Sequence, residues 1–384
     1  MLQPLVDRRA DAHGASRSGL RAHVVTGDAG FRALRPEWNR LVDGVDPPSP
    51  FISWEWTDAW WRHLRRDTGC ELAVLTLRDG ESLLGIAPFY RRRIGPPAAE
   101  MRALLPIGWE PGHGWSITEM LEPVFPEADR RLLLSALATW LEQQRMPFAV
   151  IPGMRAGDLL TPWCDRHTVA RGAGTPFLYR ALPGDWESFL GSLNKSLRDN
   201  AKYYPRLLHR HGRQAAFSVA ATSDEVRATL PVLLALHRAR AAAPAAVVHH
   251  DYFASASRRA FIEAAAPALA ARGQLRIGVL AVDGAPVAAQ MWLENAGVMF
   301  VYYSGYDPRW SRYSVAFIAL LDALQDAMSR GIGRVEFLAG LGQFKERWSP
   351  QRRLRHNVTL AAHPALFRSV MALSPVRRLL RRFS

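Results

Sequence analysis

The most readable pattern of hydrophobic and polar positions lies in the C-terminal third of the chain, where two apolar runs flank an Asp-Gly pair. Residues 275–282 are apolar and partly β-branched, the Asp-Gly pair occupies 283–284, and residues 287–293 resume the extended pattern. Asp-Gly between two such runs is typical of a hairpin turn, so the segment predicts two antiparallel strands. We expect a third strand at 298–303, because glycine and proline within 304–308 interrupt regular structure and predict a loop.

A helix, another strand and a short charged segment should follow this hairpin. The helix begins near Ser311 and stops at Gly331, since its apolar residues recur at spacings of three and four. These residues are Val315, Ile318, Ala319, Leu321, Leu324 and Met328. The strand comprises residues 335–338 and contains Glu336, and residues 344–348 form a short charged and aromatic helical turn. The helix is expected to cover the sheet.

The N-terminal half repeats this order of elements. Apolar runs at 72–77 and 83–89 flank an Asp-Gly pair at 79–80, a helix is predicted over 127–143, and a buried strand follows at 148–151. Two copies of one unit are therefore expected, each packing helices on a sheet. The fold class that this order predicts is α/β, with mixed (α+β) sheets.

The repeat divides the chain into four segments. Residues 1–20 lack periodicity and are expected to form a disordered lead-in, and the two units should occupy residues 21–175 and 176–363. Residues 364–384 mix apolar residues with arginines and predict a basic amphipathic tail. Such a tail either contacts an anionic membrane surface or docks as a helix, and the pattern does not separate the two.

Residues 192–212 predict a helix with one apolar and one basic face. The apolar face comprises Leu193, Leu197, Ala201, Tyr204 and Leu208, and the basic face Lys195, Arg198, Lys202, Arg206 and Arg210. The apolar face should pack on the protein, whereas the basic face is either solvated or binds anions, since only Asp199 opposes the repulsion among its cations. Pro205 should kink or split the helix, because it removes a backbone donor.

Two further clusters favour a structural interpretation over a ligand site. The tryptophans of residues 53–63 lie at helical spacing, which favours core packing over a stacking platform for a base or sugar. His249, His250 and Asp251 are adjacent in a predicted loop, and adjacent residues do not give metal-ligand geometry. We therefore predict no metal site.

The chain is basic, and nearly all of its positive charge is arginine. Its 384 residues include 49 Lys and Arg against 35 Asp and Glu, a formal net charge of +14, yet only Lys195, Lys202 and Lys345 are lysines. A bias in codon usage explains the bulk of this arginine better than binding of phosphates, anionic lipid or RNA. Two cysteines are too few for a disulfide framework or a zinc site. With neither a secretory signal nor an apolar run of about 18 residues, a cytoplasmic protein is expected, with membrane contact only through the tail.

The end of the second repeat resembles a known family. Residues 335–348 read VEFLAGLGQFKERW, a strand with an acidic residue followed by a glycine, a Phe-Lys pair and an aromatic residue. The residues concerned are Glu336, Gly340, Phe344, Lys345 and Trp348. This pattern resembles the CelD-like family of bacterial acyltransferases, which belongs to the GNAT superfamily and is close to the Fem peptidyltransferases. Residues 192–212 are also similar to a segment of the CelD and Fem families, and the resemblance implies a tandem GNAT-like acyltransferase.

The resemblance implies acyl-CoA as the co-substrate. Its pantetheine would run beside the strand at 298–303, and its pyrophosphate would meet the N-terminus of the next helix, where Arg309, Arg312 and Ser314 are the candidate cofactor-binding residues. The Gln/Arg-x-x-Gly-x-Gly/Ala loop of the superfamily is absent from residues 304–315. Two alternatives therefore stay open. One is a Fem-type transferase that takes its group from aminoacyl-tRNA; the other is a non-catalytic scaffold that keeps the fold.

Candidate catalytic residues lie on the adjoining strands of the second repeat. Gln290, Tyr303 and Glu336 would converge on the acceptor, and Tyr303 or Glu336 would handle its proton. Core packing is an equal alternative for Tyr303, and an ion pair with Lys345 is the alternative for Glu336. The candidate substrate-binding residues are Lys195, Arg198, Lys202 and Lys345. The family implies an amine or hydroxyl of a cell-envelope or exopolysaccharide precursor, or of a small metabolite, as the acceptor.

Overall fold

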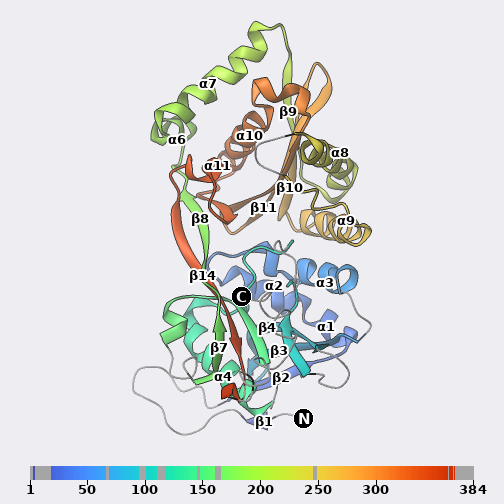
Figure 1. Cartoon of the computed structure of the whole chain (residues 1–384), viewed down its shortest axis with the longest axis vertical. Helices are drawn as coiled ribbons and strands as arrows, with labels where there is room; N and C mark the ends of the chain where they lie inside the picture. The colour runs from blue at the N-terminus through green and yellow to red at the C-terminus, as the bar shows by residue number, and fades with distance from the viewer. Residues whose placement is uncertain are drawn as a thin grey trace. The chain divides into compact units, whose positions relative to one another are not determined.

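The computed structural model divides the chain into two compact units (Figure 1). It describes residues 3–4, 19–65, 69–94, 101–109, 117–144, 148–160, 166–244, 249–361, 363–365 and 367. The first unit comprises Met1–Trp61, Arg65–Thr175 and Leu354–Ser384, and the second Arg62–Leu64 and Pro176–Arg353. Most of the expected lead-in at 1–20 and of the tail at 364–384 lies outside the described residues.

The first unit is a sheet whose neighbouring strands run in the order β1-β2-β3-β4-β5-β6-β14, with β7 paired to β14. These strands are β1 (Gln3–Pro4), β2 (Leu20–Val25), β3 (Glu71–Asp79), β4 (Ser82–Ile94), β5 (Met101–Pro106), β6 (Phe148–Met154), β7 (Thr168–Arg171) and β14 (Gln351–Leu360). Its helices are α1 (Asp28–Ala33), α2 (Arg35–Asp43), η1 (Pro50–Ile52), α3 (Trp54–His63), η3 (Glu127–Asp129), α4 (Arg130–Gln143) and η4 (Gly157–Leu160). The helix α4 connects β5 to β6, which is why these two strands are parallel.

Apolar residues of α4 and of the strands form one core of the first unit. Leu133, Leu137 and Trp140 of α4 pack with buried residues of β3, β4 and β6. The tryptophans of α3 are buried as well, with Trp56 fully covered and its indole Nε1 donating to Thr118 Oγ1 at 3.0 Å. The aromatic face of residues 53–63 is therefore core, as its spacing predicted.

The second unit is a sheet whose strands run in the order β8-β13-β12-β11-β10-β9. The strands are β8 (Thr175–Ala181), β9 (Ala215–Ala220), β10 (Leu275–Val282), β11 (Ala285–Asn295), β12 (Val298–Tyr306) and β13 (Arg334–Ala339). The helices are α6 (Trp186–Ser192), α7 (Lys195–Arg210), α8 (Ser223–Ala242), α9 (Ala256–Ala270), η5 (Pro308–Tyr313), α10 (Val315–Ser329) and α11 (Gln343–Glu346). Among the strands described in this unit, β12 and β13 alone pair in parallel, because α10 crosses over between them.

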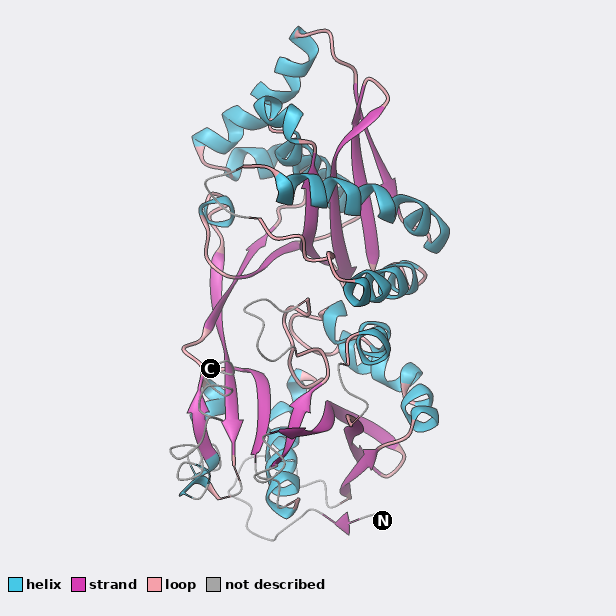
Figure 2. Ribbon diagram, turned by 45° about the vertical axis from the view of Figure 1, so that its right-hand side comes forward, coloured by secondary structure: helices cyan, strands magenta, loops and turns pink. Residues whose placement is uncertain are grey.

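Helices cover both faces of this second sheet (Figures 1 and 2). On one face, α10 buries Leu320 and Leu324 against Trp292 and Met299, and α7 packs beside it through Leu197. On the other face, α8 packs on β11 and β12, and α9 packs against α8 and β10. A sheet with two covered faces buries near-continuous apolar runs, which agrees with the almost entirely buried β11.

The two units repeat the order of elements that the sequence predicts. The hairpin β3-β4, the strand β5, the helix α4 and the strand β6 correspond to β10-β11, β12, α10 and β13. The strand beside β6 is β14, whereas the strand beside β13 is β8. Residues 354–360 lie within the predicted C-terminal unit at 176–363, but they pair with β6 and β7 of the first unit. An apolar strand pattern predicts burial and does not specify the pairing partner.

Three boundaries in the second unit differ from the prediction. The helix α10 begins at Val315 instead of Ser311, because residues 308–313 form the 3-10 helix η5. The predicted loop at 304–308 is strand as far as Tyr306, which pairs with Ala288 of β11. Pro205 does not split α7, which is one helix from Lys195 to Arg210, and burial of Leu197 and Leu208 holds it on the protein.

Candidate functional site

The parallel strands β12 and β13 part after only three paired residues. Val298, Met299 and Phe300 of β12 pair with β13, and the pairing stops at Phe300 and Glu336. Beyond that point β13 shifts its register against β8, and Leu338 adopts a left-handed backbone with φ of 63°. The edge of β12 from residue 301 onward is therefore not covered by β13, and an extended chain can pair with such an edge.

A bulge lies on this uncovered part of β12. Gln290 pairs with Ser304 and Trp292 pairs with Val301, so that Tyr302 and Tyr303 together lie opposite Met291. The buried side chain of Gln290 donates from Nε2 to the carbonyl oxygen of Met291 at 2.7 Å and to that of Tyr303 at 3.2 Å. Gln290, a predicted catalytic residue, therefore holds the bulge in place.

The ring of Tyr303 belongs to an aromatic cluster between β12 and α8. Its centroid lies 4.7 Å from Phe253, 5.0 Å from Tyr252 and 5.4 Å from His237. His237 Nδ1 is 2.9 Å from the carbonyl oxygen of Ser304, and the amide of Tyr252 donates to His237 Nε2 at 3.3 Å. A carbonyl only accepts and an amide only donates, so the imidazole is neutral with its proton on Nδ1. Burial lowers its pKa in agreement with that state.

His237 and the neighbouring Arg240 are site residues that the sequence analysis missed. Arg240 donates from Nη1 to Ser304 Oγ at 2.9 Å, and its Nη2 is 3.2 Å from His249 Nε2. The signal for His237 was its place on the apolar face of α8, one turn after Leu233. No pattern in the sequence indicated that Arg240 reaches β12, because the contact joins residues 64 positions apart.

Glu336 forms an ion pair, but its partner is not the predicted Lys345. Its fully buried carboxylate accepts from Arg353 Nη2 at 2.5 Å and lies 3.3 Å from Arg334 Nε. Arg353 also stacks over the ring of Tyr179 at 4.1 Å. Lys345 donates from Nζ to the carbonyl oxygen of Ala339 instead. An ion pair was the alternative to catalysis for Glu336, and its partners in the structure are Arg353 and Arg334, because the chain beyond Pro350 brings Arg353 back beside β13.

The start of α10 carries cations that no carboxylate neutralises among the described residues. Arg312 donates from Nη2 to Tyr313 Oη at 2.6 Å, and Arg347 lies 5.9 Å from the ring of Phe317 in the first helical turn. Ser314 precedes the helix in a left-handed conformation and its hydroxyl does not cap the first turn. Arg309 differs from these residues, since Asp307 holds its guanidinium through two oxygens and the bond lowers the pKa of Asp307.

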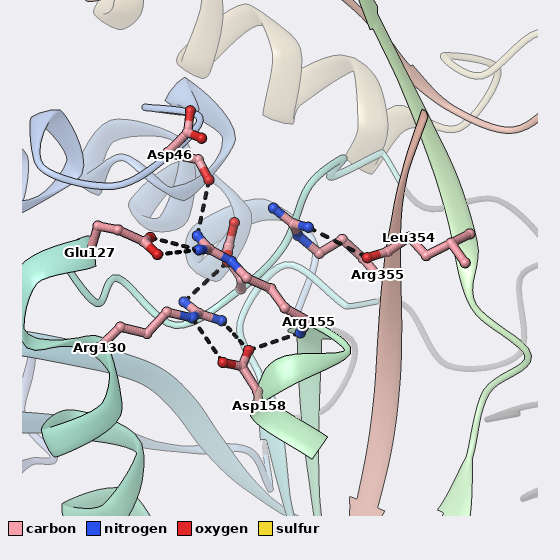
Figure 3. Close-up of polar contacts among 8 residues, drawn as sticks. Asp46, Glu127, Arg130, Arg155, Asp158, Leu354 and Arg355 are labelled. Atoms are coloured by element: carbon pink, nitrogen blue, oxygen red, sulfur yellow. Dashed lines mark hydrogen bonds and ion pairs between the residues drawn. The ribbon is translucent and has the colours of Figure 1, made fainter. Parts of the chain in front are cut away.

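The corresponding helix start in the first unit is occupied by acidic side chains (Figure 3). Arg130, the first residue of α4, donates to Asp158 Oδ2 at 2.7 Å and lies 3.4 Å from Glu122. Arg155 donates to Glu127 at 2.6 Å. Burial raises the pKa of Glu122 even though Arg130 acts against it. These carboxylates make the start of α4 unsuited to another anion, so the second unit is the better candidate for an anionic cofactor.

The basic face of α7 points into solvent. Lys195 is 84% exposed and forms an ion pair with Asp199 at 2.6 Å, Arg198 donates to the carbonyl oxygen of Gly191, and Lys202 is exposed. The helix lies on the α10 side of the sheet, whereas the Tyr303 ring contacts α8 on the opposite side. The structure therefore does not bring these three predicted substrate-binding residues to the aromatic cluster.

Two features are absent from the part of the chain that the structure describes. No group of three or more His, Cys, Asp or Glu side chains there has an arrangement that could hold a metal ion. No described helix combines the length and the apolar character needed to span a bilayer.

The fold of the second unit and its sequence both point to one class of protein. Residues 195–346, which include the parting strands, the bulge and α10, match the model of the acetyltransferase (GNAT) domain family. The second unit, a mixed α/β sheet with one parallel pair around a crossover helix, therefore has the GNAT-type fold, and the first unit repeats its order of elements. The predicted fold class is thereby confirmed. The match covers less than half of the chain.

Solved structures share this fold over most of the chain at low sequence identity. FemX superposes with a TM-score of 0.55 at 10% identity, covering 84% of this chain and 95% of that one. A conserved protein of unknown function from Bacteroides thetaiotaomicron gives 0.52 at 12% identity, covering 88% and 100%. The C-terminal domain of a putative lysylphosphatidylglycerol synthetase from Agrobacterium fabrum gives 0.51 at 12% identity, covering 90% and 97%. No curated protein is matched by the sequence.

Proposed function

We propose that this protein is an acyltransferase that moves an acyl group from acyl-CoA to an amine or hydroxyl of a CelD-type acceptor, a cell-envelope or exopolysaccharide precursor or a small metabolite. The observation that carries the proposal is the parting of β12 and β13 after Phe300 and Glu336. An extended pantetheine arm carries amide groups that can pair with the uncovered edge of β12. The acceptor class rests on the family resemblance.

The start of α10 is the proposed place for the pyrophosphate. The first amides of a helix lack intrahelical partners and favour anions, and here Arg312 and Arg347 add positive charge beside them. The glycine-rich loop of the superfamily is absent, so in the proposal its role falls to η5, which contains Arg312, and to Arg347 beside the first turn of α10. Acyl-CoA would supply the activated thioester, and every other function is assigned to side chains of this chain.

Tyr303 is the proposed proton-handling group. It belongs to the bulge that turns two consecutive residues of β12 out of the regular ladder, next to the edge where the thioester would lie. Gln290 holds the bulge through its bond to the carbonyl oxygen of Tyr303. His237 of α8 bonds Ser304 of β12 through one ring nitrogen and Tyr252, in the segment after α8, through the other. Glu336 is engaged by Arg353 and Arg334, which supports a positioning role for its carboxylate.

Calorimetric titration with acetyl-CoA and octanoyl-CoA tests the donor. The variant Arg312→Ala should weaken acyl-CoA binding at least about tenfold, because charge-assisted hydrogen bonds to phosphate are among the stronger hydrogen bonds. The matched control is Arg227→Ala, which removes an exposed arginine of α8 that is paired only with Asp224. If neither acyl-CoA binds the unaltered protein, the acyl-CoA proposal is wrong for these donors.

A Fem-type transferase that uses aminoacyl-tRNA is the second candidate. The observation that favours it is the exposed basic face of α7, where Lys202, Arg206 and Arg210 have no carboxylate partner among the described residues. Binding of tRNA should weaken steeply with salt, and the double variant Lys202→Glu, Arg206→Glu should flatten that dependence. Equal tRNA binding by the double variant would contradict this role of α7. Failure of both donors would favour a scaffold.

A further inference from the structure

Arg240 is a partly buried cation that lacks a counter-charge. Its guanidinium contacts the Ser304 hydroxyl, the neutral His249 imidazole and the face of the Tyr306 ring, whose centroid is 5.8 Å from Arg240 Cζ. Among the described residues, no aspartate or glutamate forms an ion pair with it. Arg238, two positions earlier on α8, lies 3.7 Å from Asp251, so a carboxylate of the connection to α9 does reach another arginine of this helix.

The burial of Arg240 is incompletely compensated. Burial lowers its pKa, and only the hydroxyls of Tyr306 and Tyr252 act in the other direction. Its Nε is buried without a hydrogen-bond acceptor. A guanidinium keeps its proton in a protein, so the cost of burying the charge stays in the structure until an anion arrives.

Arg180 shows what a compensated arginine looks like in the same unit. Burial lowers its pKa as well, but its guanidinium donates to the carbonyl oxygens of Trp348 and Ser192 and to the Ser192 hydroxyl. Three oxygen acceptors satisfy Arg180, whereas Arg240 has one hydroxyl and one imidazole nitrogen. A structural role therefore accounts for Arg180 more completely than for Arg240.

The position of Arg240 ties the missing anion to the reaction site. Ser304 and Tyr306 belong to the part of β12 that β13 leaves uncovered, and Ser304 directly follows Tyr303 in the bulge. Arg240 comes from α8, and His249 comes from the connection between α8 and α9. Arg312, one of the cations proposed for the donor pyrophosphate, bonds Tyr313, whose core cluster includes Tyr306, and Arg240 of α8 contacts the ring of the same Tyr306. An anion on Arg240 thus approaches the bulge from the α8 side.

We infer that the acceptor carries a carboxylate or phosphate group that binds Arg240, with Ser304 and His249 holding the guanidinium in place. This inference rests on the proposed acyltransferase function and names the class of its acceptor. Arg240 is a specificity residue in this assignment, because it binds the acceptor at a distance from the nitrogen or oxygen that is acylated. His249 must remain neutral to accept from Arg240, and the nearby positive charge together with burial lowers its pKa accordingly.

Matched pairs of acceptors that differ only in the anionic group test the inference. The pairs are glucosamine and glucosamine 6-phosphate, ethanolamine and phosphoethanolamine, and propylamine and β-alanine, so that phosphate and carboxylate are separated. When the two members of a pair compete for the enzyme, the anionic member should have a kcat/KM at least about tenfold higher than the neutral one. One charge-assisted hydrogen bond supplies enough free energy for this ratio. The variant Arg240→Met should abolish this preference, and Arg240→Lys should retain part of it.

Binding without turnover separates this inference from the proposed function. Calorimetry of phosphoethanolamine and ethanolamine at constant ionic strength, without acyl-CoA, should show the same preference and its loss in Arg240→Met. The control Arg227→Met removes an exposed arginine of the same helix and should change nothing. Thermal unfolding of each variant, with Arg240→Gln as a second substitution, identifies any loss of folding.

The binding and turnover results together have three informative outcomes. Preference for the anionic members in binding, with no acyl transfer to any of them, keeps the anion site on Arg240 and contradicts acyl transfer to these amines. Equal binding of charged and neutral members by the unaltered protein overturns the inference. It is also overturned if Arg240→Met weakens acyl-CoA binding and leaves the acceptor preference intact, since the anion then belongs to the donor.

Discussion

Buried carboxylates of the second unit differ in how their charge is compensated. Burial alone would raise the pKa of Glu294, but hydrogen bonds from Arg330 and Trp292 and the charge of Arg276 lower it. Asp322 of α10 has no hydrogen bond to a described residue, and burial raises its pKa to about 6. Both carboxylates are therefore charged at neutral pH, but only the charge of Asp322 lowers the stability of the folded protein.

The stability of the second unit should therefore depend on Asp322 at neutral pH. The folded pKa lies above the ordinary value of 3.8, so the folded state binds the proton more tightly and stability falls as pH rises through this range up to about 6. The variant Asp322→Asn should raise the free energy of unfolding at pH 8 by about 1–2 kcal/mol. At pH 3.5, below both pKa values, it should have little effect. Urea unfolding at both pH values measures this, and an equal gain at each would contradict it.

The pair of Glu336 and Arg353 should be strongly coupled. Removing one partner of a buried ion pair leaves the other charge uncompensated and costs about 3–5 kcal/mol. We expect Glu336→Gln and Arg353→Met each to destabilise the second unit, and the double variant to be much less destabilised than the sum. A double-mutant cycle in urea measures the coupling. Additive effects would mean that Glu336 does not depend on Arg353, which would return it to the list of candidate bases.

At the scale of elements, the contact between α8 and β12 brings the site together. A Cβ at Gly305 would lie 2.2 Å from the backbone nitrogen of His237 and 2.4 Å from the carbonyl carbon of Leu236. Only glycine allows the helix to approach this closely, and the approach lets His237 reach the carbonyl oxygen of Ser304. The sequence analysis assigned residues 304–308 to a loop and therefore missed this contact. Gly305 is in fact a strand residue, and a glycine there allows the close approach of a helix.

Gly305→Ala should push α8 away from β12. Backbone atoms cannot move aside as side chains do, so we expect a loss of about 2–4 kcal/mol in stability and a loss of acceptor binding. Gly333→Ala is the matched control, because a Cβ there meets nothing within 4 Å and the residue needs no left-handed backbone. Thermal unfolding and calorimetry of both variants check this expectation. Unfolding of the two variants at the same temperature would show that α8 does not press on β12.

At the scale of the whole molecule, the chain order and the sheet order differ at one strand in each unit. Residues 354–360 of β14 follow the second unit in the chain and complete the sheet of the first unit, whereas β8, the first strand of the second unit, lies beside β13. The first unit therefore depends on residues more than 200 positions beyond their partners in β6, since His356 pairs with Met154 and Leu360 with Ala149. This dependence makes the folding of the first unit non-local.

A chain that ends at Arg353 should lose protection in β6. The carbonyl and amide groups of β6 that pair with β14 would face water, so hydrogen exchange of Val150 and Ile151 should accelerate. Amides of β11 in the second unit, which keeps its Arg353, should keep their protection, and a synthetic peptide of residues 354–362 should restore that of β6. Deletion of residues 368–384 alone is the control and should leave β6 unchanged. Unaltered exchange in the chain ending at Arg353 would contradict the dependence on β14.

The sequence by itself determined the local elements and their repetition. Two Asp-Gly hairpins, the apolar face of α10 and the two faces of α7 follow from short-range periodicity, which reports burial along one element. The tertiary structure alone decided which strand joins which sheet, where β12 and β13 part, and that Arg353 instead of Lys345 pairs with Glu336. Arg240 on Ser304 belongs with these contacts. Each of them joins residues far apart in the chain, and periodicity says that a side chain is buried without saying what buries it.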